Sequence, residues 1–231
     1  MSNPLRPGRR AFVLSLGAIG VGCDASKPRS GFLGTTERFN LALERWLFSS
    51  SRQSPTPGEG ETTPAGAFPS YFISAEVPQV PAAWLLRVRG LVDRPLDLAL
   101  GDLQRMTRTD IRVRHHCVEG WSAVANWHGV RLAEIARAAG ATQKGRFVEF
   151  RSFDSGYFSS WDRESAEHAQ SIVAYGMNGE PLSPAHGAPC RMYGAVKLGY
   201  KGVKYLDEIR FLPDPTGGYW ENQGYEWYGG V

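Results

Sequence analysis

Cys117 is the residue whose type and neighbours most clearly suggest chemistry. It lies in the run RHHCVEGW, residues 114–121, with an arginine and two histidines before it and the carboxylate of Glu119 after it. Neighbouring positive charge lowers the pKa of a thiol and favours the thiolate, the form that attacks electrophiles and binds soft metals. The run therefore predicts a reactive or metal-binding thiolate. The alternative is a buried, inert cysteine at the end of a strand, because free cysteine is among the most buried residue types.

Residues 1–23 have the features of a targeting leader. The segment Pro7–Phe12 (PGRRAF) is similar to a twin-arginine export signal, and the apolar stretch from Phe12 to Gly22 is too short to span a bilayer. Twin-arginine export carries folded proteins, which suits a protein that receives a cofactor in the cytoplasm. Cys23 ends the stretch at what resembles a lipoprotein processing site. Two outcomes stay open: a soluble periplasmic protein, or one tethered through Cys23 to the outer face of the cytoplasmic membrane.

The remaining residues, 24–231, are enough for a single domain with a substantial core. Hydrophobic residues make up 42% of the chain, and the formal net charge is +3. No basic stripe is present, so we expect no nucleic-acid partner. Cys117 and Cys190 are the cysteines left after the leader. In an oxidising compartment such a pair often forms a disulfide, so a non-catalytic exported domain with a Cys117–Cys190 disulfide is an alternative of a different class.

The pattern of apolar residues predicts a mixed α+β domain. The segment 49–67 is rich in Ser, Thr, Pro, Gly and Glu and is expected to be a flexible loop. The aromatic tail 219–228 is expected to pack the C-terminal end, with a role in covering a site as the alternative. Strands outnumber the short helices, which favours mixed β-sheets over a doubly wound fold. We expect helices at 35–47, 97–103 and 131–139, and strands at 84–90, 111–115, 147–150, 172–175, 189–193 and 209–212.

Several separated motifs together resemble one known family. Cys117–Trp121, followed by Trp127–Val130 and an amphipathic helix, is similar to the molybdenum-ligand segment of the sulfite oxidase family of molybdopterin enzymes. His186–Arg191 and Gly199–Lys204 resemble the pterin-binding segments of that family. The motifs come in the family's order, and the resemblance covers residues 36–228. Among the branches of the family, that of the exported protein-methionine-sulfoxide reductase catalytic subunits is the most similar.

This resemblance implies a sulfite-oxidase-like molybdopterin-binding domain with one pterin per molybdenum. Cys117 would be the protein ligand to the metal, and Glu119 would face the metal and hold water or relay protons. Arg191 can hold the pterin phosphate with its planar guanidinium, and Lys204 can add a point charge. The full set of cofactor-binding residues that the resemblance implies is Asn40, Glu44, Ser152, His186, Arg191, Gly202, Val203 and Lys204.

The implied reaction is oxygen-atom transfer, with reduction of a sulfoxide such as free or protein-bound methionine sulfoxide ahead of sulfite oxidation. Sulfite is a dianion and needs converging arginines beside the metal. The candidates are Arg112, Arg114, Arg151 and Arg163, and the sequence leaves open which of their side chains point toward the metal. The chain has no C-x-x-C-H haem motif, so electrons must be exchanged with a separate partner, either a cytochrome or a membrane haem subunit.

Overall fold

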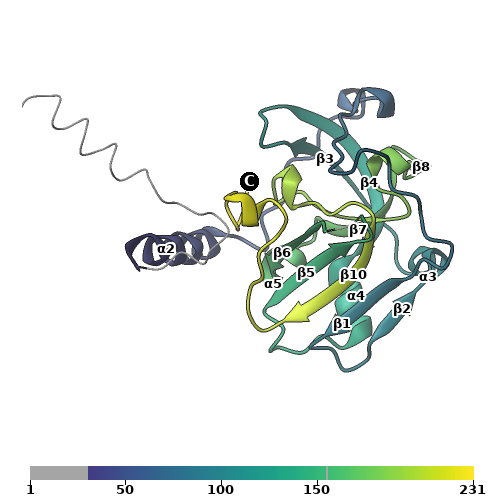
Figure 1. The fold of residues 1–231 in the computed structure, drawn as a ribbon. Coiled ribbons are helices and arrows are strands. Elements are labelled where there is room, and N and C mark those ends of the chain that lie inside the picture. The colour runs from purple at the N-terminus through teal and green to yellow at the C-terminus, as the bar shows by residue number, and fades with distance from the viewer. Residues whose placement is uncertain (1–30, 155) are drawn as a thin grey trace, which may run out of the picture.

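The computed structural model describes residues 31–154 and 156–231. The predicted leader, including Cys23, lies outside the described residues. Two β-sheets with a few short helices make up the body (Figure 1). This architecture confirms the predicted α+β class with mixed sheets.

The first sheet has the strand order β2-β1-β10-β5-β6. β1 and β10 run parallel, and the other neighbours are antiparallel. Arg87 pairs with Glu208 across β1 and β10, which joins two segments that are far apart in the sequence. The bounds of the strands are β1 Leu86–Gly90, β2 Leu96–Leu98, β5 Phe147–Ser152, β6 Phe158–Asp162 and β10 Leu206–Leu212.

The second sheet has the order β3-β4-β7-β8, and β9 also pairs with β7. β3 and β4 form a long hairpin whose pairing ends at His116 and Ser122. The loop of this hairpin therefore carries Cys117. The bounds are β3 Thr109–His116, β4 Ser122–Arg131, β7 Ser171–Met177, β8 Glu180–Pro181 and β9 Arg191–Gly194.

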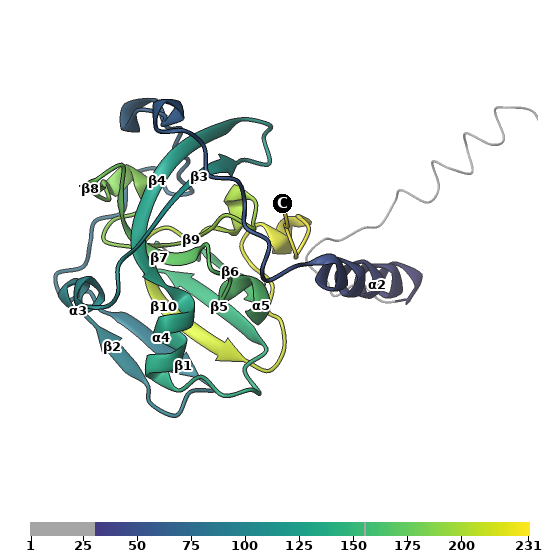
Figure 2. The same ribbon diagram turned by 180° about the vertical axis from the view of Figure 1, so that it is seen from behind.

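Helix α4 (Leu132–Ala139) packs on the first sheet (Figure 2). Its buried residues Leu132, Ile135, Ala136 and Ala139 recur at three- and four-residue spacing, which places them on one face. Gly140 ends the helix in the left-handed conformation, with φ 65°, as the sequence predicted. The helix and the sheet share the main core with buried residues of β7 and β9, so the two sheets are held as one body.

The segment 49–67 is largely irregular, with short 3-10 turns at Glu59–Glu61 and Ala65–Ala67. It is nevertheless bonded to the second sheet. Thr63 N donates to Val124 O at 2.9 Å, and Asn178 Nδ2 donates to Thr63 O at 3.1 Å. The segment therefore lies along the β3–β4 hairpin.

The structure corrects the predicted helix at 97–103. Leu96–Leu98 is strand β2, and the helix, α3 (Leu100–Arg105), begins later. The carboxylate of Asp102 accepts the backbone N–H of Ala99 at 2.8 Å, which fixes the helix start after Ala99. Strands β4, β6 and β8 and the short helix α5 (Arg163–Ala166) were not predicted. The predicted helix at 35–47 is α2 (Gly31–Leu47), which begins four residues earlier.

Candidate active site

A cavity of about 210 Å³ opens beside the loop that carries Cys117. Its wall is formed by residues of the β3–β4 loop, the segment 68–73, the region 185–205 and the C-terminal segment. The predicted site residues that line it are Cys117, Glu119, Ser152, His186, Arg191, Gly202 and Lys204. The fold thus brings together residues that are spread over almost ninety positions of the sequence.

Cys117 sits in a tight loop that fixes its direction. Cys117 N donates to Trp121 O at 3.0 Å, and Gly120 N donates to Cys117 O at 3.1 Å. Gly120 has φ 89°, a conformation that glycine adopts at low cost. The Cys117 thiol donates to Glu119 Oε2 at 3.8 Å, and Trp121 Nε1 donates to the same oxygen at 3.0 Å. Trp121 therefore holds the Glu119 carboxylate beside the sulfur.

The expected effect of neighbouring cations on Cys117 is not found. Burial raises the pKa of the thiol above its usual value, and the nearby Glu119 carboxylate adds to this. Arg114 points away from the thiol and pairs with Glu61 at 2.9 Å. His115 is buried, and its desolvation lowers its pKa to about 3, so this imidazole is neutral. These surroundings favour the neutral thiol of Cys117, and a bound metal would favour the thiolate.

Arg191 is a buried cation that faces the cavity without an anion. Its Nη1 donates to His186 O at 3.1 Å, while its Nε is buried and has no hydrogen-bond partner. The guanidinium carbon lies 5.0 Å from the centre of the Trp127 ring. Within residues 31–154 and 156–231 no carboxylate forms an ion pair with Arg191, and burial lowers the pKa of this guanidinium. An unpaired buried charge is costly, so the site is suited to an anionic ligand.

Lys204 adds a second cation to the same wall. Its Nζ donates to Tyr71 O at 2.5 Å and to Ala185 O at 3.2 Å. Burial, and next the charge of Arg191, lower the pKa of Lys204 to about 7. Gly187, with φ 100°, leaves room for this side chain, since a Cβ there would lie 2.8 Å from Lys204 Cβ.

Two small residues, Gly202 and Ser152, line the same cavity as Arg191. A Cβ at Gly202 would lie 3.2 Å from Arg191 Nη2, so glycine keeps the guanidinium accessible. Ser152 Oγ accepts the backbone N–H of Asp154 at 2.9 Å, which leaves its hydroxyl hydrogen able to bond a ligand. These residues fit a metal cofactor that carries sulfur ligands and a phosphate. The Cys117 thiol can bind the metal, and the Arg191 guanidinium and the Lys204 ammonium can bind the phosphate, with Gly202 leaving room beside Arg191.

Three predicted cofactor residues do not line the cavity. Val203 is fully buried in the main core, where its carbonyl accepts the backbone N–H of Met192 at 2.8 Å. Asn40 is exposed on α2. Glu44 lies on the same helix, close to Glu226. Burial is the main cause that raises the pKa of Glu44, and the negative charge of Glu226 is the second. Their cofactor roles stay predictions that this geometry does not support.

The two cysteines of the described chain are free thiols. Cys190 is fully buried in the main core and its thiol donates to Leu206 O at 3.7 Å, whereas Cys117 lines the cavity. The alternative of a domain closed by a Cys117–Cys190 disulfide is therefore wrong for this structure.

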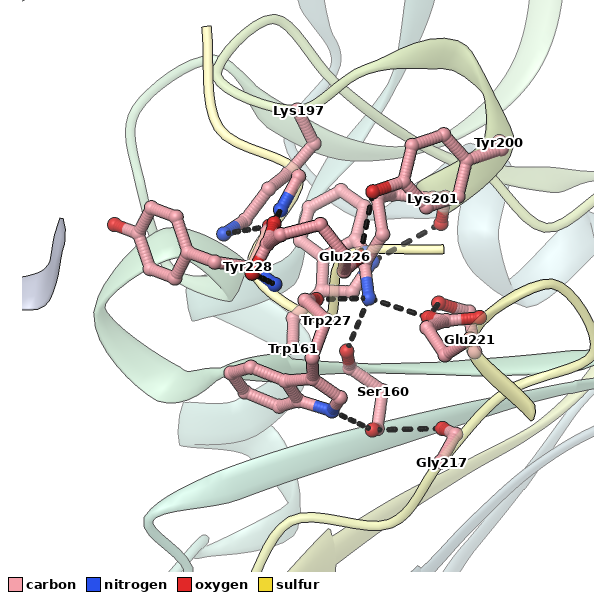
Figure 3. Close-up of polar contacts among 12 residues, drawn as sticks. Ser160, Trp161, Lys197, Tyr200, Lys201, Gly217, Glu221, Glu226, Trp227 and Tyr228 are labelled. Carbon is pink, nitrogen blue, oxygen red and sulfur yellow. Dashed lines mark hydrogen bonds and ion pairs between the residues drawn. The ribbon is translucent and has the colours of Figure 1, made fainter. Parts of the chain in front are cut away.

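The C-terminal segment forms one wall of the cavity through Trp220 and Tyr225. This corrects the expectation that the aromatic tail only packs the C-terminal end. Lys201, which is fully buried, holds the segment in place (Figure 3). Its Nζ donates to Glu221 Oε1 at 2.5 Å, to Trp227 O at 2.6 Å and to Ser160 O at 2.8 Å. Nothing in the sequence singled out Lys201, because a lysine next to a glycine is expected to be solvent-exposed.

Sequence reasoning also missed most of the aromatic lining. The aromatic residues of the wall are Phe68, Tyr71, Phe72, Trp121, Tyr157, Tyr200, Tyr205, Trp220 and Tyr225. Arg191 is the arginine in the lining; Arg112, Arg114, Arg151 and Arg163 instead bond to groups outside it. The lining of the cavity is therefore rich in aromatic residues, and the arginines expected for a dianion do not converge on it.

Comparison with known proteins identifies the family. The model of the oxidoreductase molybdopterin binding domain matches residues 74–220. The chain belongs to this family, the sulfite oxidase family of molybdopterin oxidoreductases. It is 35% identical over 233 residues to YedZ1 of Azospira oryzae, a chain named as a candidate protein-methionine-sulfoxide reductase subunit; the match covers 97% of this chain and 88% of that one.

Two further proteins are similar to this chain, one in sequence and one in fold. The catalytic subunit MsrP of the protein-methionine-sulfoxide reductase of Xanthomonas axonopodis pv. citri is 33% identical over 144 residues, covering 56% of this chain and 45% of that protein. The sulfane dehydrogenase SoxCD of Paracoccus pantotrophus shares the fold, with a TM-score of 0.61 at 20% identity, covering 85% of this chain and 56% of that chain. The protein is thus an oxidoreductase with a molybdenum–molybdopterin cofactor, as the sequence predicted.

Proposed function

We propose that this molybdopterin oxidoreductase reduces sulfoxide-type substrates such as methionine sulfoxide. The observation that carries the proposal is the cavity lining, which is rich in aromatic residues and has no set of converging arginines. A sulfoxide is neutral and its carbon substituents are apolar, so an aromatic lining suits it better than it suits sulfite. The names of the YedZ1 and MsrP relatives support the same choice.

Each residue of the site has a role in this proposal. Cys117 is the protein ligand to molybdenum, and Arg191 and Lys204 hold the pterin phosphate with charge-assisted hydrogen bonds. When bound, the cofactor supplies oxygen-atom transfer, in which a sulfoxide takes up two electrons and two protons to give a thioether and water. Glu119, fixed by Trp121 beside the sulfur, holds water or relays those protons. The aromatic wall positions the sulfur substituents of the substrate.

We further propose export of the folded protein by the twin-arginine route and delivery of electrons by a separate haem partner. The first rests on the PGRRAF segment and the second on the absence of a C-x-x-C-H motif from the sequence. Replacing Arg9 and Arg10 with lysine should leave the protein in the cytoplasm, which cell fractionation would reveal.

The decisive experiment uses protein made in a host that synthesises molybdopterin. The parent should contain nearly stoichiometric molybdenum and reduce methionine sulfoxide with an artificial electron donor. Cys117→Ser should lose turnover, whereas Cys190→Ala, which removes the thiol outside the cavity, should keep metal and turnover. A parent that oxidises sulfite and leaves methionine sulfoxide unchanged would overturn the choice of substrate.

A further inference from the structure

Helix α2 is held to the body through one face near its C-terminal end. Arg45 donates from Nη2 to both oxygens of Glu164, at 3.0 and 3.2 Å, and its guanidinium lies 5.5 Å from the centre of the Phe147 ring. Just after the helix, the Phe48 ring contacts the ring of His168, with centroids 5.9 Å apart. These contacts fix the rotation of the helix about its own axis.

The opposite face of α2 carries a stripe of large apolar side chains. Phe39, Leu43, Trp46 and Leu47 are 66%, 40%, 77% and 65% exposed. Their spacing of four, seven and eight residues places them on a single helix face. Phe39, Leu43 and Leu47 are turned away from Arg45, and Trp46 lies at the edge of the stripe, where it also lines a pocket between α2 and the body. Figures 1 and 2 both show α2 standing away from the two sheets. Apolar side chains concentrated on one exposed face mark an interaction surface, because leaving them in water is unfavourable.

The chain before α2 indicates what covers this stripe. The apolar stretch from Phe12 to Gly22 is followed by Cys23, and α2 begins at Gly31. Eight residues of extended chain span at most about 28 Å, so a membrane-held leader or an acylated Cys23 would keep α2 at the bilayer surface. Trp46 also has the amphipathic ring that favours the membrane interface.

We propose that the stripe of Phe39, Leu43, Trp46 and Leu47 binds a lipid bilayer, with α2 lying in the plane of the membrane surface. The helix carries charged residues along its length, and none of the helices in residues 31–154 and 156–231 is long and apolar enough to cross a membrane. The stripe thus acts at the headgroup boundary. This proposal rests on the geometry of α2 and on the proposed export, and it is independent of the reaction at the cavity.

The test is sedimentation of the full chain with vesicles of phosphatidylethanolamine and phosphatidylglycerol. Cys23→Ser is included in every sample so that acylation does not contribute. Replacing Phe39 and Trp46 with serine should lower the partition coefficient at least about tenfold, which corresponds to about 1.4 kcal/mol. The matched control is Val80→Ser, which removes an apolar side chain that is 43% exposed outside α2 and should leave partitioning unchanged.

Amide hydrogen exchange gives the second measurement. Vesicles should slow exchange in residues 39–47 of the parent and leave it unchanged in the Phe39→Ser/Trp46→Ser variant. Equal partitioning of parent and variant would overturn the proposal. So would a lipid-free parent that is a dimer by analytical ultracentrifugation and becomes monomeric in the variant, since the stripe would then join two copies of the chain.

Discussion

At the scale of single residues, the site depends on which face of a strand each side chain occupies. Along β3, Arg112 and Arg114 point toward the segment 57–61, while His115 points inward and lines the cavity. Neighbours in a strand face opposite sides, so the arginines closest to Cys117 in sequence do not act on its sulfur. The basic residues that line the site are Arg191, which comes from another strand of the same sheet, and Lys204.

Arg191→Met should have opposite effects on the empty and the loaded protein. Without cofactor, the variant loses an uncompensated buried charge, and its free energy of unfolding should rise by about 1 kcal/mol, or about 2–4 °C in Tm. In a host that makes molybdopterin, its molybdenum content should fall. Thermal melts of cofactor-free protein and elemental analysis of loaded protein measure the two effects. A variant that is less stable when empty would show that Arg191 serves packing instead of an anion.

Lys204 should make the stability of the cofactor-free protein depend on pH. Burial lowers the pKa of Lys204 in the folded chain to about 7, below the ordinary value of 10.5 that the unfolded chain restores. Between these values the unfolded state binds more protons, so this residue makes stability rise with pH from about 7 to 10.5. Below about pH 7 Lys204 is protonated in both states and its contribution no longer changes with pH. Lys204→Met removes this contribution. Urea unfolding at pH 7 and pH 9 should show a smaller rise for the variant than for the parent, and an equal rise would contradict the prediction.

At the scale of elements, regular patterns predicted structure where apolar residues alternate or run together, as in the fully buried β7, and failed where polar residues interrupt a buried strand. Helix α4 was predicted because its apolar residues follow helical spacing and Gly140 ends it. Strand β4 is buried along nearly its whole length, so it lacks the alternation that reveals a half-buried strand. Strand β6 was missed because it buries Ser159 and Ser160, whose hydroxyls donate to Glu221 and to backbone carbonyls of the C-terminal segment. Those partners are known only from the fold.

The Lys201–Glu221 ion pair should determine both the stability of the protein and the shape of the cavity wall that the C-terminal segment forms. Lys201→Met leaves a buried carboxylate without its cation and should lower the free energy of unfolding by about 3–5 kcal/mol. Lys201→Met/Glu221→Gln should recover part of this loss, because no buried charge is then left unpaired. A double-mutant cycle by urea unfolding measures the coupling.

The same pair positions Trp220 and Tyr225, so a double variant that folds should raise the KM for methionine sulfoxide more than it lowers kcat. The substitution of Val80 with serine is the matched surface control. Loss of kcat with an unchanged KM would mean that the C-terminal segment affects the reaction centre and not the binding of substrate at the cavity wall.

At the scale of the whole molecule, the cavity is a meeting point of distant segments. Residues 68–73, the β3–β4 loop, Ser152 with Asp154, the region 185–205 and the C-terminal segment all contribute to its wall. Single motifs pointed to Cys117, Glu119, His186, Arg191, Gly202 and Lys204, which line the cavity, because these residues occur in short runs. The aromatic wall could not be predicted in the same way, since Tyr71, Tyr157 and Trp220 become neighbours only when both sheets and the C-terminal segment are assembled.

Cofactor binding should therefore slow amide exchange in all of these segments together. A ligand that binds only the folded state stabilises it, and local openings of its binding segments become rarer when it is bound. Exchange should slow in residues 68–73, 117–121 and 220–225 of loaded protein relative to cofactor-free protein, while α4, which does not line the cavity, should change little. Arg191→Met, prepared in the same host, should lose this protection in proportion to its missing molybdenum. Protection confined to residues 117–121 would mean that the cofactor contacts the loop of Cys117 alone and that the rest of the wall encloses substrate.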